Sequence, residues 1–164
     1  MLQARQLIPP LTLRDSQGHE THAWDFKQTK NLVIAFVHAD CVLCERFVRS
    51  LAEHARELED KEAVVLLPFP REPSPPLSCP LPHGFIAGID PSGRSTKAFL
   101  GEEGSPPRAG SGLGVFVTDR YGEISARWPV MGHEFPTMHE ILSAVDSVEI
   151  ACEECYVPYW PIEE

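Results

Sequence analysis

The sequence predicts an α/β fold in which helices flank a central mixed β-sheet. Residues 31–37 form a nearly continuous apolar run, which is typical of a strand buried on both faces. Apolar side chains then recur at helical spacing over about residues 42–58, and residues 63–67 form a second apolar run. A strand, a helix and a strand at this spacing indicate a βαβ unit, in which the two strands run parallel.

Two hairpin patterns add antiparallel strands to this unit. Residues 11–13 and 20–22 flank a polar turn that contains Gly18, which predicts an N-terminal β-hairpin. Residues 114–118 and 123–128 flank a second short turn and predict a second hairpin. The other predicted elements are a one-turn connector at 24–28, a proline-rich loop at 68–84, a strand at 85–89, a short helix at 94–100 and an amphipathic helix at 137–148.

Length and composition indicate one globular domain that spans residues 1–164. A chain of this size buries up to about 70% of its unfolded surface, so it does not need disulfides to stay folded. The formal net charge of −10 argues against a nucleic-acid or anionic-membrane partner. No apolar stretch is long enough to span a bilayer, and no targeting pattern is recognisable, so the expected location is a reducing cytoplasm.

Two cysteines stand where the central strand ends and the following helix begins, at Cys41 and Cys44. The first turn of a helix presents unpaired backbone N–H groups and a positive dipole end, and both favour a thiolate. A second thiol one turn away can resolve a mixed disulfide. In a reducing compartment such a pair is catalytic or metal-binding, and the alternative to redox chemistry is half of a zinc site.

Three side chains beside the pair are candidates for auxiliary roles. Asp40 and Glu45 flank the cysteines, and because their charges oppose the helix dipole they are expected to raise the pKa of the attacking thiol. His38 is a candidate for local positive charge or for a base, although strand alternation also allows it to point into the core.

Further candidates lie in segments that the fold should bring near the cysteine edge or carry away from it. Cys79 lies after the second parallel strand and is a candidate third redox partner, and His133 lies after the last strand and is a candidate proton carrier. Cys152 and Cys155 repeat the cysteine spacing in the tail, residues 149–164. They are candidates for a second dithiol, a structural disulfide or half of a zinc site shared across a dimer.

The order of these elements resembles the thioredoxin fold, and within it the chain resembles the redoxins of the peroxiredoxin and TlpA-like group, which includes the alkyl hydroperoxide reductase and thiol-specific antioxidant proteins. The likeness covers about residues 7–148. The motifs that carry it are the opening hairpin at 10–18, the segment 33–44, the strand and turn at 89–93 and the late hairpin at 116–124.

The resemblance implies roles for the two cysteines. Cys41 matches the attacking thiol of a thioredoxin-type pair and Cys44 the resolving thiol, whereas in peroxiredoxins the peroxidatic cysteine matches Cys44. The chain also departs from thioredoxins. Ala35 stands where they carry a buried acid, and Leu113 or Gly114 stands where they carry a cis-proline that faces the cysteines.

The expected activity is therefore dithiol–disulfide exchange at Cys41 and Cys44, in an enzyme that needs no cofactor. The expected partners are protein or small-molecule disulfides or hydroperoxides and a cellular dithiol reductant, and a homodimer is left open. The first alternative is a thiol peroxidase that uses Cys44 and resolves with Cys41. The second is a non-catalytic module that binds zinc or another protein.

Overall fold

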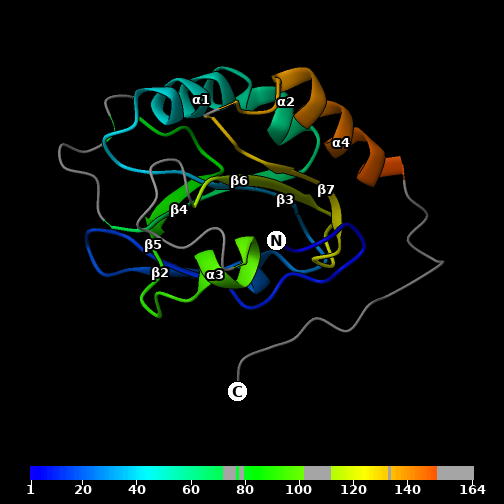
Figure 1. The fold of residues 1–164 in the computed structure, drawn as a ribbon. Helices are drawn as coiled ribbons and strands as arrows, with labels where there is room; N and C mark the ends of the chain where they lie inside the picture. Colours follow the sequence, from blue (N-terminus) through cyan, green and yellow to red (C-terminus); the bar gives the residue numbers. More distant parts are fainter. Residues whose placement is uncertain (72–76, 78–79, 102–111, 133, 151–164) are drawn as a thin grey trace.

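The computed structural model describes residues 1–71, 77, 80–101, 112–132 and 134–150 (Figure 1). The elements are β1 (Thr12–Arg14), β2 (Glu20–His22), the 3-10 helix η1 (Ala23–Phe26), β3 (Asn31–Phe36), α1 (Val42–Glu53), α2 (Ala55–Asp60), β4 (Ala63–Phe69), β5 (Phe85–Ile89), α3 (Ser95–Leu100), β6 (Gly114–Thr118), β7 (Ile124–Pro129) and α4 (Met138–Ile150). Within these described residues, no helix combines the length and apolar character needed to cross a bilayer.

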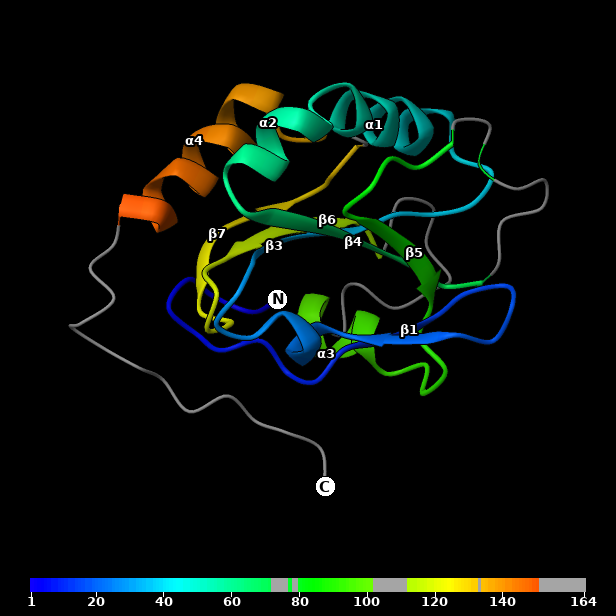
Figure 2. The same ribbon diagram turned by 180° about the vertical axis from the view of Figure 1, so that it is seen from behind.

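The strands of the described residues form one seven-stranded mixed sheet in the order β2-β1-β5-β4-β3-β6-β7. The strand β3 pairs in parallel with β4 and antiparallel with β6, and β5 continues the parallel part beside β4. Helices α1, α2 and α4 cover one face of this sheet, while α3 lies against the opposite face (Figures 1 and 2). The predicted central mixed sheet flanked by helices is confirmed.

The central strand β3 is buried on both faces because its apolar side chains pack into two cores. Val33 and Ala35 belong to the cluster under α1, α2 and α4, whereas Leu32, Ile34 and Phe36 belong to the cluster on the α3 side. This alternation follows from the strand geometry, in which successive side chains point to opposite faces. It explains why the sequence of β3 reads as a continuous apolar run instead of an alternating one.

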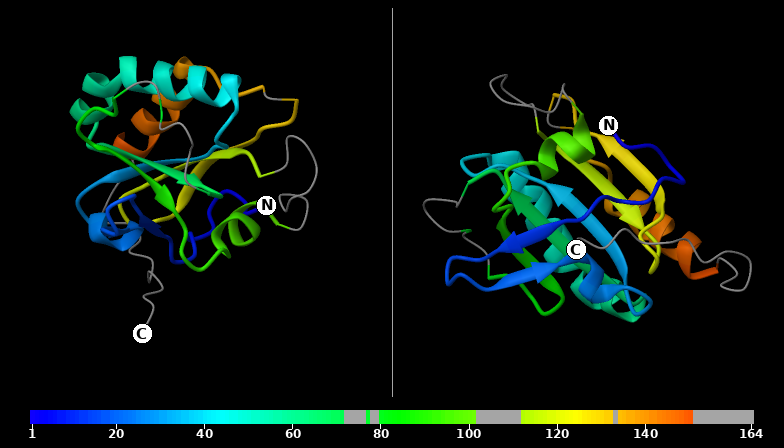
Figure 3. Two further views of the ribbon diagram at one scale, coloured as in Figure 1. Left: turned by 90° about the vertical axis from the view of Figure 1, so that its left-hand side faces the viewer. Right: turned by 90° about the horizontal axis from the view of Figure 1, so that it is seen from below.

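The predicted N-terminal hairpin is present as β1 and β2, which pair antiparallel with Leu13 opposite Thr21. It joins the sheet edge through β1, whose Arg14 pairs with Ile89 of β5. Seen from the side and from below, this hairpin and the N-terminal segment lie on the sheet face that α3 also covers (Figure 3). Ile8 and Leu11 are buried there, so the N-terminal part of the chain closes the second core.

The prediction of one helix over residues 42–58 is wrong, because the structure divides it at His54 into α1 and α2. The ring nitrogen Nδ1 of His54 lies 2.8 Å from the carbonyl oxygen of Ser50 and donates to it. That carbonyl is the one that the backbone N–H of residue 54 would bond in a continuous α-helix. The N–H of His54 bonds Leu51 instead, and the helix turns at this point.

The predicted boundary between a strand and a loop at Pro68 is also wrong, because β4 continues to Phe69. Pro68 pairs with Gly88 of β5, and its carbonyl accepts the N–H of Val37 just beyond the end of β3. Because Pro68 has no N–H to donate toward β3, the β3–β4 register ends at Ile34 and Leu66, while the bond from Val37 still holds the two strands together at this edge. The longer strand carries the chain further along the edge at which β3 ends.

Candidate active site

The candidate active site lies at the edge of the sheet where β3, β4 and β7 all end. The register places Phe36, the last residue of β3, opposite Gly114 of β6, and Gly114 opposite Pro129 at the end of β7. Because β4 is parallel to β3, its last residue Phe69 points the chain to the same edge. The segments after all three strands therefore meet around the start of α1.

Cys41 is the N-cap residue of α1, and Cys44 lies in its first turn. The backbone of Cys41 is extended, with φ −125° and ψ 102°, and its Sγ accepts the N–H of Cys44 at 3.1 Å. The two sulfurs form a disulfide, with the Cα atoms 5.2 Å apart. An N-cap side chain normally accepts this kind of bond from an orphan N–H, so in the reduced protein the same geometry favours a Cys41 thiolate.

The two cysteines differ in their access to solvent. Cys44 is 2% exposed and belongs to the core cluster under α1, whereas Cys41 is half-buried at the rim of that cluster. The residues between them, Val42 and Leu43, are 66% and 41% exposed, and Met131 on the segment after β7 is 77% exposed. A reactant from solvent therefore reaches Cys41 before Cys44, over an apolar surface.

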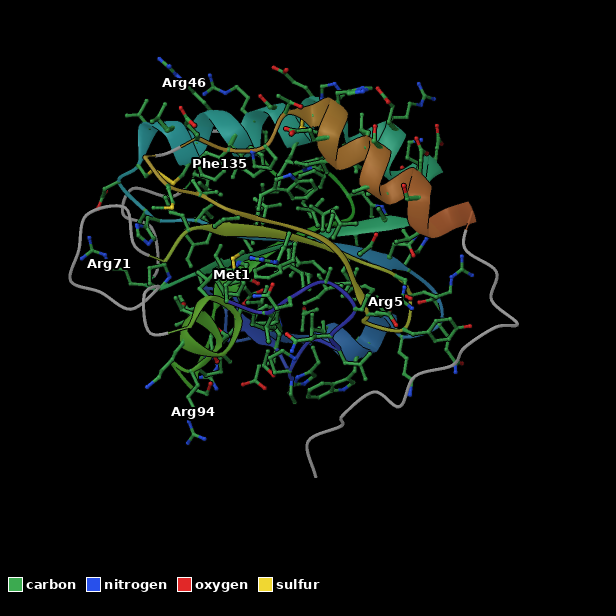
Figure 4. The ribbon with its side chains drawn as sticks, turned by 45° about the vertical axis from the view of Figure 1, so that its right-hand side comes forward. Met1, Arg5, Arg46, Arg71, Arg94 and Phe135 are labelled. Carbon is green, nitrogen blue, oxygen red and sulfur yellow. A yellow bond between two sulfur atoms is a disulfide. The ribbon has the colours of Figure 1, made fainter. Side chains whose placement is uncertain are left out.

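The segment after β7 packs against α1 through a pair of stacked aromatic rings. The rings of Phe47 and Phe135 lie 4.4 Å apart at an angle of 15°. Figure 4 shows Phe135 beneath α1, on the inner side of the helix. Phe47 lies one turn after Cys44 in the same core cluster, so this stack holds the end of α1 that carries the disulfide. Phe135 carries no signal in the sequence beyond being aromatic, so its place at this site could not be predicted.

Asp40, which we predicted beside the pair, is held in the left-handed backbone region with φ 56°. Its carboxylate pairs with the guanidinium of Arg71, at 3.1 Å from Nη2 to Oδ2. Arg71 follows β4 and was not among the sequence candidates. His38 is half-buried between β3 and Asp40, and Glu45 is half-buried in the first turn of α1. The structure therefore brings Asp40, His38 and Glu45 to the cysteine edge as expected, and adds a positive charge.

The remaining candidates lie outside the described residues: Cys79, His133, Cys152 and Cys155. The segments that precede the first two do start at the cysteine edge, as predicted from the directions of β4 and β7. Among the described residues, no group of three or more His, Cys, Asp and Glu side chains has the arrangement of a metal site. The zinc hypothesis for the tail is untested.

The two departures from the thioredoxin pattern have structural counterparts. Ala35 is fully buried on the face of β3 that packs under α1, so position 35 offers no proton acceptor to Cys44. Leu113 is buried just before β6, and its carbonyl accepts the N–H of Val130. Its side chain therefore fills core space at the place where thioredoxins have a proline.

No family model matches the sequence, and no curated protein matches it. Solved structures do match the fold. A yeast mitochondrial 1-Cys peroxiredoxin aligns with a TM-score of 0.70 at 17% identity, over 92% of this chain and 78% of the peroxiredoxin. The mitochondrial 2-Cys peroxiredoxin of Plasmodium falciparum aligns with a TM-score of 0.68 at 15% identity, over 89% of this chain and 94% of that one.

A third match is the thioredoxin domain of a thiol-disulfide oxidoreductase from Bacteroides vulgatus, with a TM-score of 0.64 at 14% identity, over 90% of this chain and 98% of that domain. The matches thus include proteins named for disulfide exchange and proteins named as peroxiredoxins, and at these identities they establish a shared fold. The chain has the thioredoxin fold, with a Cys-x-x-Cys disulfide where its central strand meets its first long helix.

Proposed function

We propose that this protein is a thiol–disulfide oxidoreductase in which Cys41 attacks and Cys44 resolves. The observation that carries the proposal is the asymmetry of the pair. Cys41 is the more accessible sulfur and accepts a helix N–H, whereas Cys44 is 2% exposed and one turn away. The accessible sulfur is thus the one best stabilised as a thiolate, which is the reactive form.

In the proposed reaction the reduced protein transfers two electrons to a substrate disulfide. The Cys41 thiolate attacks one substrate sulfur, the substrate S–S bond breaks, and the departing thiolate takes a proton. Cys44 then loses its proton and attacks Cys41 Sγ, which releases the second substrate thiol and leaves the intramolecular disulfide. A cellular dithiol reduces that disulfide again. Since Ala35 cannot accept the Cys44 proton, we propose His38 or solvent for this step.

Single cysteine variants test the assignment. Cys44→Ser should accumulate a mixed disulfide between Cys41 and a substrate, because the resolving thiol is gone, and Cys41→Ser should abolish disulfide reduction. Insulin and oxidised glutathione serve as protein and small-molecule substrates, and peptide mass spectrometry identifies the trapped cysteine. Cys79→Ser is the matched control. Trapping at Cys44 in the Cys41→Ser variant would contradict the proposal.

The same variants separate the peroxidase alternative. A peroxidase that uses Cys44 should lose hydrogen peroxide turnover in Cys44→Ser, while Cys41→Ser should still form a sulfenic acid at Cys44. The burial of Cys44 in the disulfide form argues against this order of events, since peroxide would have to pass Cys41 first. Rapid peroxide consumption that survives Cys41→Ser would favour the peroxidase.

A zinc assay with thiol titration tests the non-catalytic alternative. Stoichiometric zinc together with protected thiols would favour a binding module, whereas reactive thiols in metal-free protein favour the redox enzyme. The cytoplasmic location, a role in cell redox homeostasis and a homodimer stay predictions. Cell fractionation and light scattering are the measurements that test location and assembly.

A further inference from the structure

The ion pair between Asp40 and Arg71 joins two segments that meet at the attacking cysteine. Asp40 immediately precedes Cys41, and Arg71 follows β4 by two residues. The two charged atoms lie 3.1 Å apart although the residues are separated by 31 positions in the chain. Figure 4 shows Arg71 at one side of the molecule and Arg94 beside α3.

The conformation of Asp40 indicates that this residue is held in place. Its φ of 56° lies in the left-handed region, which costs free energy for residues other than glycine and is best tolerated by Asp and Asn. This turn between β3 and α1 sets the extended conformation in which Cys41 caps the helix. Asp40 is the residue directly before Cys41, and a negative charge close to a thiol disfavours the thiolate.

We propose that Arg71 is a positioning residue for the reaction, which neutralises the Asp40 carboxylate and thereby keeps the Cys41 thiol reactive. This inference rests on the proposed function, in which Cys41 is the nucleophile. Arg71 acts through Asp40 and not by contact with the substrate. Without Arg71, the two acids that flank the cysteine pair would act on the attacking thiol with no opposing charge from the segment after β4.

Other charged and titratable side chains lie next to Cys41 in the chain or on the segments that meet at the cysteine edge. In the described residues they include His38 on the turn before it, Cys44, Glu45 and Arg46 near the start of α1, and Glu134 on the segment after β7. None of these is altered in the variants below. Their contribution to the thiol pKa is therefore common to all the proteins that are compared.

The test is the pH dependence of iodoacetamide alkylation at Cys41 in the reduced protein, read by peptide mass spectrometry. Arg71→Gln should raise the thiol pKa, and Asp40→Asn should lower it while preserving the tolerance for positive φ. Exposed pairs contribute about 0.2–1 kcal/mol, and a change of this size in the thiol's ionisation corresponds to an about 1.4- to fivefold change in alkylation rate below the thiol pKa. Arg71→Lys should restore most of the wild-type rate.

The double variant decides whether Arg71 acts through Asp40. If it does, the effect of Arg71→Gln should shrink in the Asp40→Asn background, because the carboxylate that holds the guanidinium in place is gone. The effect should also shrink at about 1 M salt, where screening acts over about 3 Å. The matched control is Arg94→Gln, which makes the same change in net charge at an exposed site beside α3 and should leave the alkylation profile unchanged.

Two outcomes would overturn the inference. One is an Arg71→Gln profile that superimposes on the wild type, and the other is an equal shift in both backgrounds, which would show a general charge effect. A failure of the proposed function itself would give a different result from either of these two outcomes. In that case wild-type Cys41 would be no more reactive than the other thiols, and substrate disulfides would not be reduced, whatever residue stands at position 71.

Discussion

Replacing Phe135 by leucine is predicted to loosen the segment after β7 from helix α1. The ring of Phe135 stacks on Phe47 with centroids 4.4 Å apart, and Phe47 is itself only 6% exposed. Leucine keeps most of the apolar volume but has no ring. The variant should therefore lose mainly the aromatic interaction, about 0.5–1.5 kcal/mol, with a smaller contribution from the volume removed.

Thermal unfolding of the oxidised protein measures this loss. For a domain of this size each kcal/mol lowers Tm by about 2–4 °C, so Phe135→Leu should melt about 2–5 °C below the wild type. Phe85→Leu is the matched control. Phe85 is half-buried against the same core cluster and has no aromatic ring partner among the described residues, so its change removes the same atoms without breaking a stack.

A double-mutant cycle with Phe47→Leu completes the test. If the two rings stabilise each other, the double variant should lose less than the sum of the two single variants. Strictly additive losses, or equal losses in Phe135→Leu and Phe85→Leu, would refute the reasoning. The segment after β7 would then be held by general burial and not by the stack beside the disulfide.

Two further predictions concern the fold that supports the site. In Gly88→Ala the new Cβ would lie 2.7 Å from the backbone carbonyl oxygen of Arg14, so we expect a loss of about 1–3 kcal/mol, and an unchanged urea midpoint would show that β1 can shift without cost. Burial raises the pKa of Asp90, but hydrogen bonds from Ser95 and Ser92 outweigh it, and the pKa lies below its ordinary value. This carboxylate therefore stabilises the fold above about pH 4, and the stabilisation is lost as pH falls through the folded-state pKa. Asp90→Asn should flatten the acid limb of stability in urea titrations, and an unaltered limb would contradict it.

Most elements of the fold can be predicted from local patterns in the sequence. The side chains of β3 are apolar at every position that faces either core. This could be predicted because a continuous apolar run can be recognised without knowing which strands pair with it. The two hairpins could also be predicted, because each turn and its two flanking strands lie within one short segment. Pairing with β5, by contrast, extends β4 through Pro68, and that depends on a strand almost twenty positions further on.

The division of the helix at His54 could not be predicted from spacing, because Leu51, Ala55 and Leu58 all keep the helical period across the break. At the break, a hydrogen bond from the ring of His54 to the Ser50 carbonyl stands in place of the backbone bond. A histidine within a helix makes such a bond only in some rotamers. The periodicity of the apolar side chains is the same with and without it.

The two reactive cysteines can be predicted from a short segment of sequence, whereas the charges around them depend on contacts between segments that are far apart in the chain. Cys41 and Cys44 could be found from their spacing and their place at a strand-to-helix junction, since both signals lie within one short segment. Parallel strand direction also predicts that the segment after β4 reaches the same edge. It does not predict that Arg71, out of that whole segment, meets Asp40. Because Arg71 pairs with Asp40, the sequence alone misses one positive charge on the segments that meet at the nucleophile, and only the contact between these segments reveals it.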